Sequence, residues 1–485
     1  MATIIVDNRI RIYDLTDSER TALKALFSHE NPKGKMMRAR KMRGWWNEPL
    51  VISTWDERDG ALSVPRGGMA KVRSTLQSMS VPFQVQDRRE RGSPVLFPSS
   101  SAVDMWPHQV RIVDACMKRE NCLVKSSTGS GKTTALLQFA SRVQTTSLVV
   151  VHSNALMRQW VERAERELGI PAEDVGVIGD GKKTIRDLTV GTTKSVAKAA
   201  EDPEFRARWG AVLADEVHLF AAKTFFECID PFPARYRVGV SDDQRRKDRK
   251  EFLIHDLFGD VAEEVSHEEM VAAGHVMDVE VLLVPTEFRA PWYTGEDGDR
   301  SPDYTRLVGE MSIDAERNAL VEGILRRELA DNRQCLVFAR EREHCRELGR
   351  RAAQYARSGY LIGGPGADRQ EFDRTRKGLK EGQLRAAVGT LQACGTGVDL
   401  PGVEVGIAAV PLLANRQMFR QARGRICRKP AGKTVARFYV LWDRHVFGLR
   451  PLENAASWNA TTFIWDKDTW APLKAYLKNQ RITRK

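Results

Sequence analysis

The sequence SSTGSGKTT, from Ser126 to Thr134, decides how the rest of the chain is interpreted. Apolar residues that fit a short buried strand precede it, and the stretch 135–143 after it fits a helix. The loop therefore lies at a helix N-terminus, where unpaired N–H groups and the helix dipole favour a bound anion. The Lys132 side chain can reach the β- and γ-phosphates of a nucleotide, and the Thr133 hydroxyl can bind Mg²⁺.

Seven residues of this loop and of the following turn are the expected nucleotide contacts: Thr128, Gly129, Ser130, Gly131, Lys132, Thr133 and Thr134. The usual pattern is G-x-x-x-x-G-K-[ST], and Ser126 stands in place of its first glycine. Gln109 precedes the loop, and its amide offers the donor and acceptor that the N6 and N7 edge of adenine requires. We therefore expect Gln109 to contact the base.

Composition limits the class of protein. A length of 485 residues predicts about three domains. The net charge of +12 favours a polyanionic partner. The seven cysteines contain no C-x-x-C pair, so we expect reduced core residues and neither a zinc cluster nor a disulfide framework. No stretch approaches the roughly 18 apolar residues of a membrane span, and we expect neither a membrane protein nor a secreted one.

Residues 1–100 combine short alternating stretches with turn signals, which predicts a small α+β domain. A run of basic residues without an acid precedes Trp45 and Trp46: Lys33, Lys35, Arg38, Arg40, Lys41 and Arg43. Two interpretations stay open. The run is either a solvated loop with both tryptophans in the core, or a surface that follows a phosphate backbone. The segment 93–101 contains two prolines and four serines, and we expect a linker.

After the loop, apolar strand-like runs alternate with helical stretches, which is typical of a doubly wound parallel sheet. The run 147–151 is one such strand. Polar residues follow two of these runs, at the strand ends where α/β folds bind ligands: His152, Ser153 and Asn154 after the first, and Thr192, Thr193 and Lys194 after the second. They are candidate contacts to a nucleic-acid backbone, with helix capping as the alternative role.

A further buried run, 211–214, is followed by Asp215 and Glu216. Burying charge is unfavourable unless a partner is present, and a bound metal would provide one. We expect Asp215 to hold Mg²⁺ through water and Glu216 to orient and deprotonate the attacking water. A capped surface turn is the alternative.

Together these residues resemble the superfamily 2 helicases and translocases. The loop resembles motif I, residues 215–218 (DEVH) resemble motif II, and Gln109 lies where the family carries an adenine-reading glutamine. The stretches 388–401 and 421–428 are similar to motifs V and VI. The resemblance implies two tandem RecA-like α/β parallel-sheet domains behind a small N-terminal domain, with ATP between the two. We expect the boundaries 1–100, 101–285, 286–441 and a basic, aromatic extension 442–485.

The resemblance also implies roles for residues of the later motifs. Arg425 and Arg428 lie three apart, on one side of an expected helix, and would stabilise the charge on the transferred phosphate. Gly397 and Asp399 would contact the nucleotide, and Thr390 the nucleic acid. His218, Ser241 and Gln421 would couple hydrolysis to movement.

Motif III departs from the family pattern. The family usually carries Ser/Thr-Ala-Thr, whereas this chain has Ser241, Asp242 and Asp243. Two carboxylates near a triphosphate are unfavourable unless cations compensate, and Arg245, Arg246 and Lys247 follow them. We expect hydrolysis to persist and coupling to be altered, which replacing Asp242 by alanine together with Asp243 by threonine would test.

The predicted function is an ATP- and Mg²⁺-dependent DNA helicase or translocase that remodels branched or duplex DNA, resembling phage and repair helicases of the UvsW type. The predicted location is the cytoplasm of a bacterium or a phage-infected host. DNA is favoured over RNA as the partner, and protein partners cannot be read from the chain. The alternatives are an RNA helicase, and a DNA-binding clamp with weak hydrolysis because motif III is altered.

Overall fold

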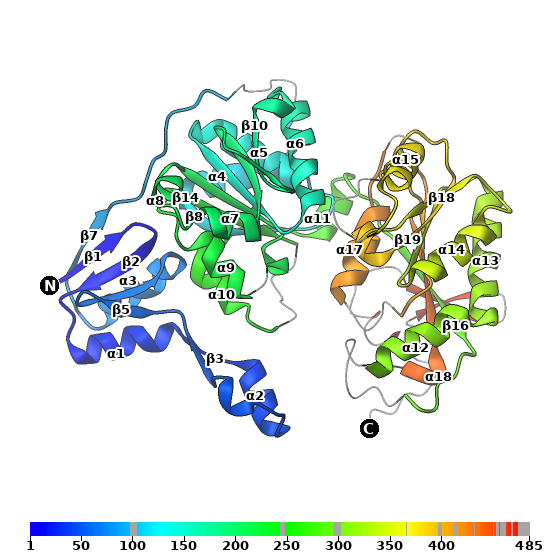
Figure 1. Cartoon of the computed structure of the whole chain (residues 1–485), viewed down its shortest axis with the longest axis horizontal. Coiled ribbons are helices and arrows are strands. Elements are labelled where there is room, and N and C mark those ends of the chain that lie inside the picture. The colour runs from blue at the N-terminus through cyan, green and yellow to red at the C-terminus, as the bar shows by residue number, and fades with distance from the viewer. Residues whose placement is uncertain are drawn as a thin grey trace. The chain divides into compact units, whose positions relative to one another are not determined.

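The computed structural model describes most of the chain: residues 1–97, 104–220, 222–242, 248–293, 302–364, 366–395, 400–411, 416–430, 432–449, 451–452, 455, 462–466 and 469–473. The chain divides into two compact units, Met1–Ser266 and His267–Lys485 (Figure 1). Among the described residues, no helix combines the length and apolar character that crossing a membrane requires.

A five-stranded sheet begins the first unit, in the order β5-β6-β2-β1-β7. Its strands alternate between buried and half-buried side chains where one face packs on a core, as in β1 (Ala2–Val6) and β2 (Arg9–Tyr13). Leucine and valine side chains of two helices fill that core. The remaining elements are α1 (Asp17–Leu26), β5 (Asp56–Arg58), β6 (Ala61–Pro65), α3 (Met69–Ser78) and β7 (Phe83–Asp87). The predicted small α+β domain is confirmed.

The first unit continues with an eight-stranded sheet, in the order β11-β10-β12-β9-β13-β14-β8-β15. Every neighbouring pair is parallel except β10 and β11. The central strands β9 (Ser147–Val151) and β13 (Ala211–Asp215) are buried along their whole length, which explains their continuous apolar runs. The other strands are β8 (Asn121–Ser126), β10 (Val175–Gly179), β11 (Lys182–Thr184), β12 (Leu188–Thr192), β14 (Tyr236–Ser241) and β15 (Val261–Val265).

Helices connect these strands, as the alternation of strand-like runs and helical stretches predicts. Leu156, Trp160, Ala164 and Leu168 all lie on the buried face of α6 (Asn154–Leu168). The remaining helices are α4 (Pro107–Arg119), α5 (Lys132–Val143), α7 (Thr193–Ala199), α8 (Pro203–Ala207), α9 (Ala222–Ile229) and α10 (Phe252–Phe258).

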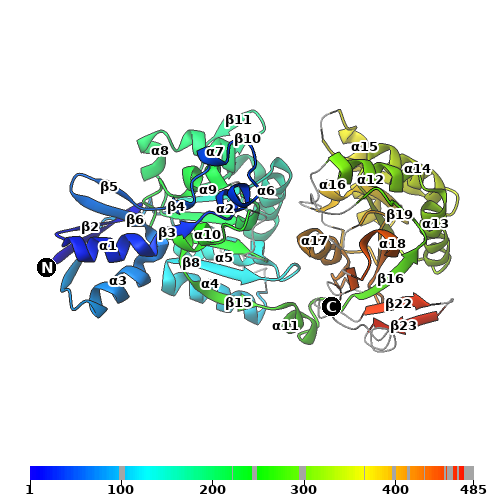
Figure 2. The same cartoon turned by 90° about the horizontal axis from the view of Figure 1, so that it is seen from below.

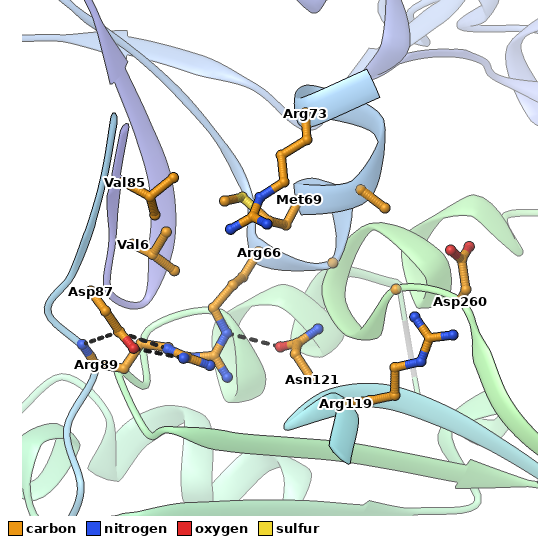
Figure 3. Close-up of a pocket in the computed structure, with 13 residues that line it drawn as sticks. Val6, Arg66, Met69, Arg73, Val85, Asp87, Arg89, Arg119, Asn121 and Asp260 are labelled. Atoms are coloured by element: carbon orange, nitrogen blue, oxygen red, sulfur yellow. Dashed lines mark hydrogen bonds and ion pairs between the residues drawn. The ribbon is translucent and has the colours of Figure 1, made fainter. Parts of the chain in front are cut away.

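Two buried arginines attach the small sheet to the large one. Arg66 is 3% exposed and donates from Nε to Asn121 Oδ1 at 2.8 Å (Figure 3). Its Nη1 donates to the Ala234 carbonyl at 2.6 Å. Burial lowers the pKa of the Arg66 guanidinium well below its ordinary value. Arg237 is fully buried and donates to the Asn8 carbonyl at 3.0 Å. A cavity of about 470 Å³ remains beside Arg66 at this junction.

The segment 93–101 is less free than the expected linker. Pro94 forms an antiparallel bridge with Thr145, and the Val95 amide donates to the Gln144 carbonyl at 3.0 Å. Phe97 is buried. The described part of the segment therefore packs on the eight-stranded sheet, because its backbone finds partners next to β9. Residues 98–101 lie outside the described part.

The second unit contains another eight-stranded sheet, in the order β18-β19-β17-β20-β21-β16-β22-β23. All neighbouring pairs are parallel except β22 and β23, which Figure 2 shows next to β16. The strands are β16 (Glu280–Thr286), β17 (Cys335–Ala339), β18 (Ser358–Leu361), β19 (Ala386–Thr390), β20 (Val405–Ala408), β21 (Arg437–Asp443), β22 (Thr462–Asp466) and β23 (Thr469–Pro472).

Helices of the second unit include α13 (Ala315–Ala330), where the Asp314 carboxylate accepts from the Arg317 amide at 2.8 Å and acts as the N-cap. The others are α11 (His267–Ala272), α12 (Pro302–Ile313), α14 (Arg342–Ala352), α15 (Arg369–Lys380), α16 (Leu391–Gly395), α17 (Arg416–Ile426) and α18 (Arg444–Phe447). The two parallel sheets confirm the predicted tandem α/β fold.

The division between the units differs from the expected boundary at 285/286. The first compact unit ends at Ser266 and the second begins at His267. Strand β16 belongs to the sheet of the second unit because it pairs with β21 and β22. The residues after 441 are also less separate than expected, since β22 and β23 extend that sheet. The basic end, 474–485, lies outside the described residues.

Candidate functional site

Five neighbouring parallel strands of the first unit end at one edge of the sheet. In the order β12-β9-β13-β14-β8, each strand pairs in register with the next. Because carboxyl ends of parallel strands meet at one edge, the residues that follow them are neighbours. All the predicted site residues of this unit after Gln109 end one of these strands, follow it or begin the next helix. The sheet topology thus brings the candidate site together.

The loop after β8 has the backbone that a phosphate site needs. Gly129 and Gly131 have φ of 91° and 75°, a region that favours glycine, and Gly131 directly precedes α5. Two contacts to Ser130 hold the loop: His108 Nε2 lies 2.8 Å from the Ser130 carbonyl oxygen, and Ser126 Oγ lies 2.6 Å from Ser130 Oγ. Ser126 therefore supports the loop through its hydroxyl, although the usual pattern has glycine there.

Gln109 also supports the loop. Its Nε2 donates to the Ser130 carbonyl at 3.2 Å, and its Oε1 accepts from the Trp106 amide at 2.9 Å. A Cβ on Gly131 would lie 2.2 Å from this Nε2, so a side chain at position 131 would displace the Gln109 amide. The contact of Gln109 to adenine stays a prediction.

The end of β13 places the two predicted carboxylates against the loop. Lys132 Nζ donates to Glu216 Oε1 at 2.9 Å, which joins residues 84 positions apart. Asp215 Oδ2 accepts from the indole N–H of Trp160 at 2.9 Å. Among the described residues, Asp215 Oδ1 is buried and has no hydrogen-bond partner. Glu216 has φ of 53°, so a strained backbone turns its side chain towards Lys132.

Burial and neighbouring charges shift the pKa values of Asp215, Glu216 and Lys132 in different directions. Burial, with Glu216 next to it, raises the pKa of Asp215 to about 6. Burial would also raise the pKa of Glu216, but Lys132 and His218 outweigh it and lower the value to about 2. Burial opposes the charge of Lys132, yet Glu216, Asp242 and Asp215 raise its pKa. The carboxylate of Glu216 is therefore ionised and paired.

Motif III, at the end of β14, contacts both motif II and the phosphate loop. His218 Nδ1 lies 2.5 Å from Ser241 Oγ and 3.5 Å from Glu216 Oε2. Asp242 Oδ2 accepts from Thr128 Oγ1 at 2.8 Å. Asp242 is expected from its sequence context to need compensation by the cations that follow it, and the structure shows its carboxylate hydrogen-bonded to the phosphate loop. Residues 243–247 lie outside the described part, so compensation by Arg245, Arg246 and Lys247 stays a prediction.

The first turn of α5 contains the two threonines of the loop motif. Thr133 is buried beside the loop. Thr134 Oγ1 accepts from Arg163 Nη2 at 2.7 Å, and Arg163 Nε in turn donates to Glu167. The Thr134 hydroxyl therefore binds helix α6.

The polar residues after β9 and β12 are adjacent, because Val151 pairs with Thr192. Ser153 Oγ accepts from the Leu156 amide at 3.3 Å and caps α6, which is the alternative role given for it above. Asn154 donates to Asp180, and Thr192 donates to Ser195.

The other residues of this group differ in exposure. Lys194 is exposed and Thr193 is buried. Burial lowers the pKa of His152, whose Nδ1 has no hydrogen-bond partner among the described residues.

The predicted site residues of the second unit lie in different elements of that unit. The hydroxyl of Thr390, at the end of β19, accepts from the Ala393 amide at 3.4 Å. Arg425 lies in α17, which ends at Ile426, so Arg428 follows the helix in a bridge with Val276. The expectation that both arginines face one side of a helix is wrong. The Met277 amide donates to the Cys427 carbonyl and thereby fixes the chain in an extended bridge. Gln421 lies in α17, whereas its side chain and residues Gly397 and Asp399 lie outside the described part.

Two residues of the site were missed. They are Trp160, which donates a hydrogen bond to Asp215, and Arg163, which donates one to Thr134. No local sequence signal identifies them, since their partners Asp215 and Thr134 lie in other elements. All seven cysteines are buried, as expected for core residues, and their reduced state stays a prediction. Within the described ranges, no cluster of three or more His, Cys, Asp or Glu side chains could hold a metal.

Comparisons with known proteins show what the chain is similar to. Residues 102–241 match the family model described as "Type III restriction enzyme, res subunit". The chain is 25% identical over 357 residues to the "DNA 3'-5' helicase XPB" of Kineococcus radiotolerans, which covers 71% of this chain and 61% of that protein. It is 26% identical over 369 residues to a "Putative DNA 3'-5' helicase Rad25" of Halobacterium salinarum, covering 74% of this chain and 58% of that protein.

A solved structure shows the same fold. A fragment of a putative HsdR subunit of a type I restriction enzyme from Vibrio vulnificus superimposes with a TM-score of 0.52 at 16% identity, covering 74% of this chain and 68% of that one. The predicted resemblance to superfamily 2 helicases is confirmed. The chain spans about three fifths of the length of the two curated relatives, 61% and 58%.

Proposed function

We propose that this chain, which has the fold and ordered motifs of superfamily 2 helicases, uses ATP hydrolysis to remodel branched or duplex DNA. The observation that carries the proposal is the 2.9 Å contact between Lys132 Nζ and Glu216 Oε1. It joins the phosphate loop to the ionised carboxylate that would activate water. A triphosphate in the loop would compete with Glu216 for Lys132 and release the carboxylate for that role.

The residues present fit Mg²⁺. Asp215 Oδ1 is buried without a hydrogen-bond partner among the described residues, which is costly unless a cation or water binds there. We assign Asp215 and Thr133 to the metal, which would neutralise charge on the phosphates when bound. Trp160 fixes the Asp215 carboxylate through its second oxygen. The loop residues 128–134 would bind the phosphates, and Gln109 would bind the adenine.

The later motifs would complete the reaction. We assign Arg425 and Arg428 to charge stabilisation during phosphoryl transfer, and Gly397 and Asp399 to nucleotide contacts. His218 and Ser241 are bonded to each other beside Glu216, which suits a coupling role for this pair. Gln421 is assigned the same role from its motif alone.

Residues after β9, β12 and β19 are the proposed nucleic-acid contacts: His152, Ser153, Asn154, Thr192, Thr193, Lys194 and Thr390. The named relatives are DNA helicases, which favours DNA as the partner. An RNA helicase is the alternative within the same fold. The second alternative, a clamp with weak hydrolysis, is motivated by the hydrogen bond from Thr128 to Asp242, because it places a carboxylate next to the phosphate loop. We place the protein in a bacterial or phage-infected cytoplasm, and the narrower UvsW-type role is also a proposal.

ATP hydrolysis measured with single-stranded, forked and duplex DNA and with RNA tests the proposal, with Glu216→Gln as the inactive control. Stimulation by DNA that the control lacks is expected. Absence of stimulation by every polymer would exclude the motor, and stimulation by RNA alone would exclude DNA as its substrate.

A further inference from the structure

We propose that residues 28–53 form a nucleic-acid-binding arm whose exposed tryptophan stacks on an unpaired base beside a duplex. The arm contains the antiparallel strands β3 (Ser28–Glu30) and β4 (Val51–Ser53), with α2 (Pro32–Ala39) and the 3₁₀ turn η1 (Trp45–Asn47) between them. In Figure 1, β3 leads away from the five-stranded sheet to α2. The inference deepens the proposed function, on which it rests, by naming a further contact to the substrate.

The arm is an ordered element. Asn31 is fully buried, and its Nδ2 donates to Glu48 Oε1 at 2.9 Å and to the Pro49 carbonyl at 2.8 Å. A Cβ on Gly34 would lie 2.3 Å from the Pro49 carbonyl oxygen, so α2 packs directly against the returning chain. These contacts hold the end of the arm in one conformation.

Large apolar side chains at the end of the arm are exposed. Trp46 is 65% exposed, and Met36 and Met42 are 44% and 42% exposed. The Arg38 guanidinium lies 4.9 Å from the ring centroid of Trp45, whose centroid is 6.1 Å from that of Trp46. Of the two interpretations left open, the one with both tryptophans in the core is therefore excluded, since Trp46 is exposed and Trp45 is half-buried. An aromatic face exposed in this way can stack on a base.

The charged residues of the arm indicate which class of molecule it binds. Residues 28–53 contain six basic residues and two acidic ones. Lys33 and Lys35 pair with those acids, Glu48 and Glu30. Within the arm, all of which the structure describes, three exposed basic side chains form no hydrogen bond, ion pair or ring contact: Arg40, Lys41 and Arg43. Aromatic residues, methionine and arginine also occur at protein interfaces, but the centre of such an interface is depleted of charge, whereas a phosphate backbone recruits a cluster of unpaired cations. Nucleic acid is the partner that uses both features.

One buried carboxylate fixes both ends of the arm. Asp256, in α10, is fully buried. His29 Nε2 lies 2.8 Å from Asp256 Oδ2, and Thr54 Oγ1 donates to the same oxygen at 2.6 Å. Helix α10 packs on β8, the strand that leads into the phosphate loop. The arm is therefore attached to the domain that would bind ATP, and it would keep its position relative to that domain during hydrolysis.

Binding of fluorescein-labelled forked DNA without nucleotide, followed by anisotropy, tests the inference in the full chain. Trp46→Ala is expected to weaken binding by about 5- to 100-fold, because one base would no longer stack on the indole. Trp46→Phe should retain most of the affinity. The matched control is Leu96→Ala, which removes a leucine side chain that is 84% exposed and lies outside the arm. Replacing Arg40, Lys41 and Arg43 by alanine should reduce the salt dependence of binding, by roughly 0.7 to 0.9 in slope for each phosphate that these cations neutralise.

Thermal unfolding of each variant checks that it folds, and ATP hydrolysis without DNA should be unchanged in Trp46→Ala. Wild-type affinity of a folded Trp46→Ala protein for forked DNA would overturn the inference and leave a protein partner for the arm. If the wild-type chain binds the fork through Trp46 but does not hydrolyse ATP, the proposed function fails and the arm stands. If hydrolysis is stimulated by DNA and Trp46→Ala binds normally, only the arm fails.

Discussion

At the scale of single residues, Glu216 is the central side chain of the candidate site. It follows β13 with a positive φ and contacts both Lys132 and His218. Holding a non-glycine residue in this conformation costs about 1–3 kcal/mol, which the surrounding contacts must offset. Such a cost is consistent with the proposed role of Glu216, because a carboxylate that activates water must be held in one position.

Glu216→Gln should lower ATP hydrolysis by about 10²- to 10⁴-fold, because an amide cannot accept the proton of the attacking water. Binding of a fluorescent ATP analogue should persist in this variant, since the loop is intact. Lys132→Ala serves as the comparison, because it removes a phosphate contact and should weaken binding too. Wild-type hydrolysis by Glu216→Gln would remove Glu216 from the mechanism.

Asp242 provides a second test at this scale. Its carboxylate is bonded to Thr128 and lies close enough to Lys132 to raise that pKa. Asp242→Asn keeps the shape but removes a negative charge near the expected triphosphate, which should lower the KM for ATP by roughly fivefold, or about 1 kcal/mol. The exposed substitution Asp114→Asn is the control. An unchanged or higher KM would contradict this electrostatic role.

His344 predicts how stability depends on pH. Burial, assisted by Arg317, lowers its pKa from 6.5 to about 4, while its Nε2 lies 2.9 Å from Asn318 Oδ1. Between these values the unfolded chain binds a proton that the folded chain does not, so stability falls as pH falls from 6.5 to about 4. The loss is at most about 3 kcal/mol.

Urea unfolding at several pH values measures this dependence. His344→Gln can keep a hydrogen bond to Asn318 but cannot titrate, so its stability should vary less over the same interval. Equal pH dependence of variant and wild type would show that His344 is not the responsible group.

Much of this chemistry could be predicted from residue types. Lys132, Asp215 and Glu216 follow recognisable strand and loop patterns, and the structure brings them together. The Thr128–Asp242 bond joins residues 114 positions apart, and it exists because β14 lies next to β8. The order of strands in a parallel sheet is not encoded in local periodicity, so this contact could not be foreseen.

At the scale of elements, boundaries were predicted less well than element types. Helix α17 was expected to carry both arginines, but the bridge between Val276 and Arg428 ends the helical path at Ile426. The sequence likewise left the arm at 28–53 open between core and surface. In both cases the deciding partner lies far away in the sequence, and local propensity says nothing about it.

The attachment of the arm to α10 can be measured as a coupling energy. Thr54→Val and Asp256→Ala each remove one side of the 2.6 Å bond, and a double-mutant cycle should give about 0.5–3 kcal/mol of coupling in the free energy of unfolding. Asp256→Ala alone should cost about 1–3 kcal/mol because buried donors lose their acceptor. Pairing Thr54→Val with the exposed Asp114→Ala should give no coupling. A cycle near zero for Thr54 and Asp256 would mean that the arm is not held there.

At the scale of the whole molecule, the chain has two units with one eight-stranded, mostly parallel sheet each, and a small sheet in front of the first. The tandem α/β architecture could be predicted because buried parallel strands leave continuous apolar runs. The division at 266/267 could not, since β16 has the same apolar character as strands of either sheet and only its pairing assigns it.

Release of a labelled strand from forked DNA is the measurement that tests the central claim most directly, because it reports movement as well as hydrolysis. We expect release by the wild-type chain with ATP and Mg²⁺, and none with a non-hydrolysable analogue or with Glu216→Gln. Strand release that continues in Glu216→Gln, or a fork that stays intact while DNA-stimulated ATP hydrolysis proceeds, would contradict it.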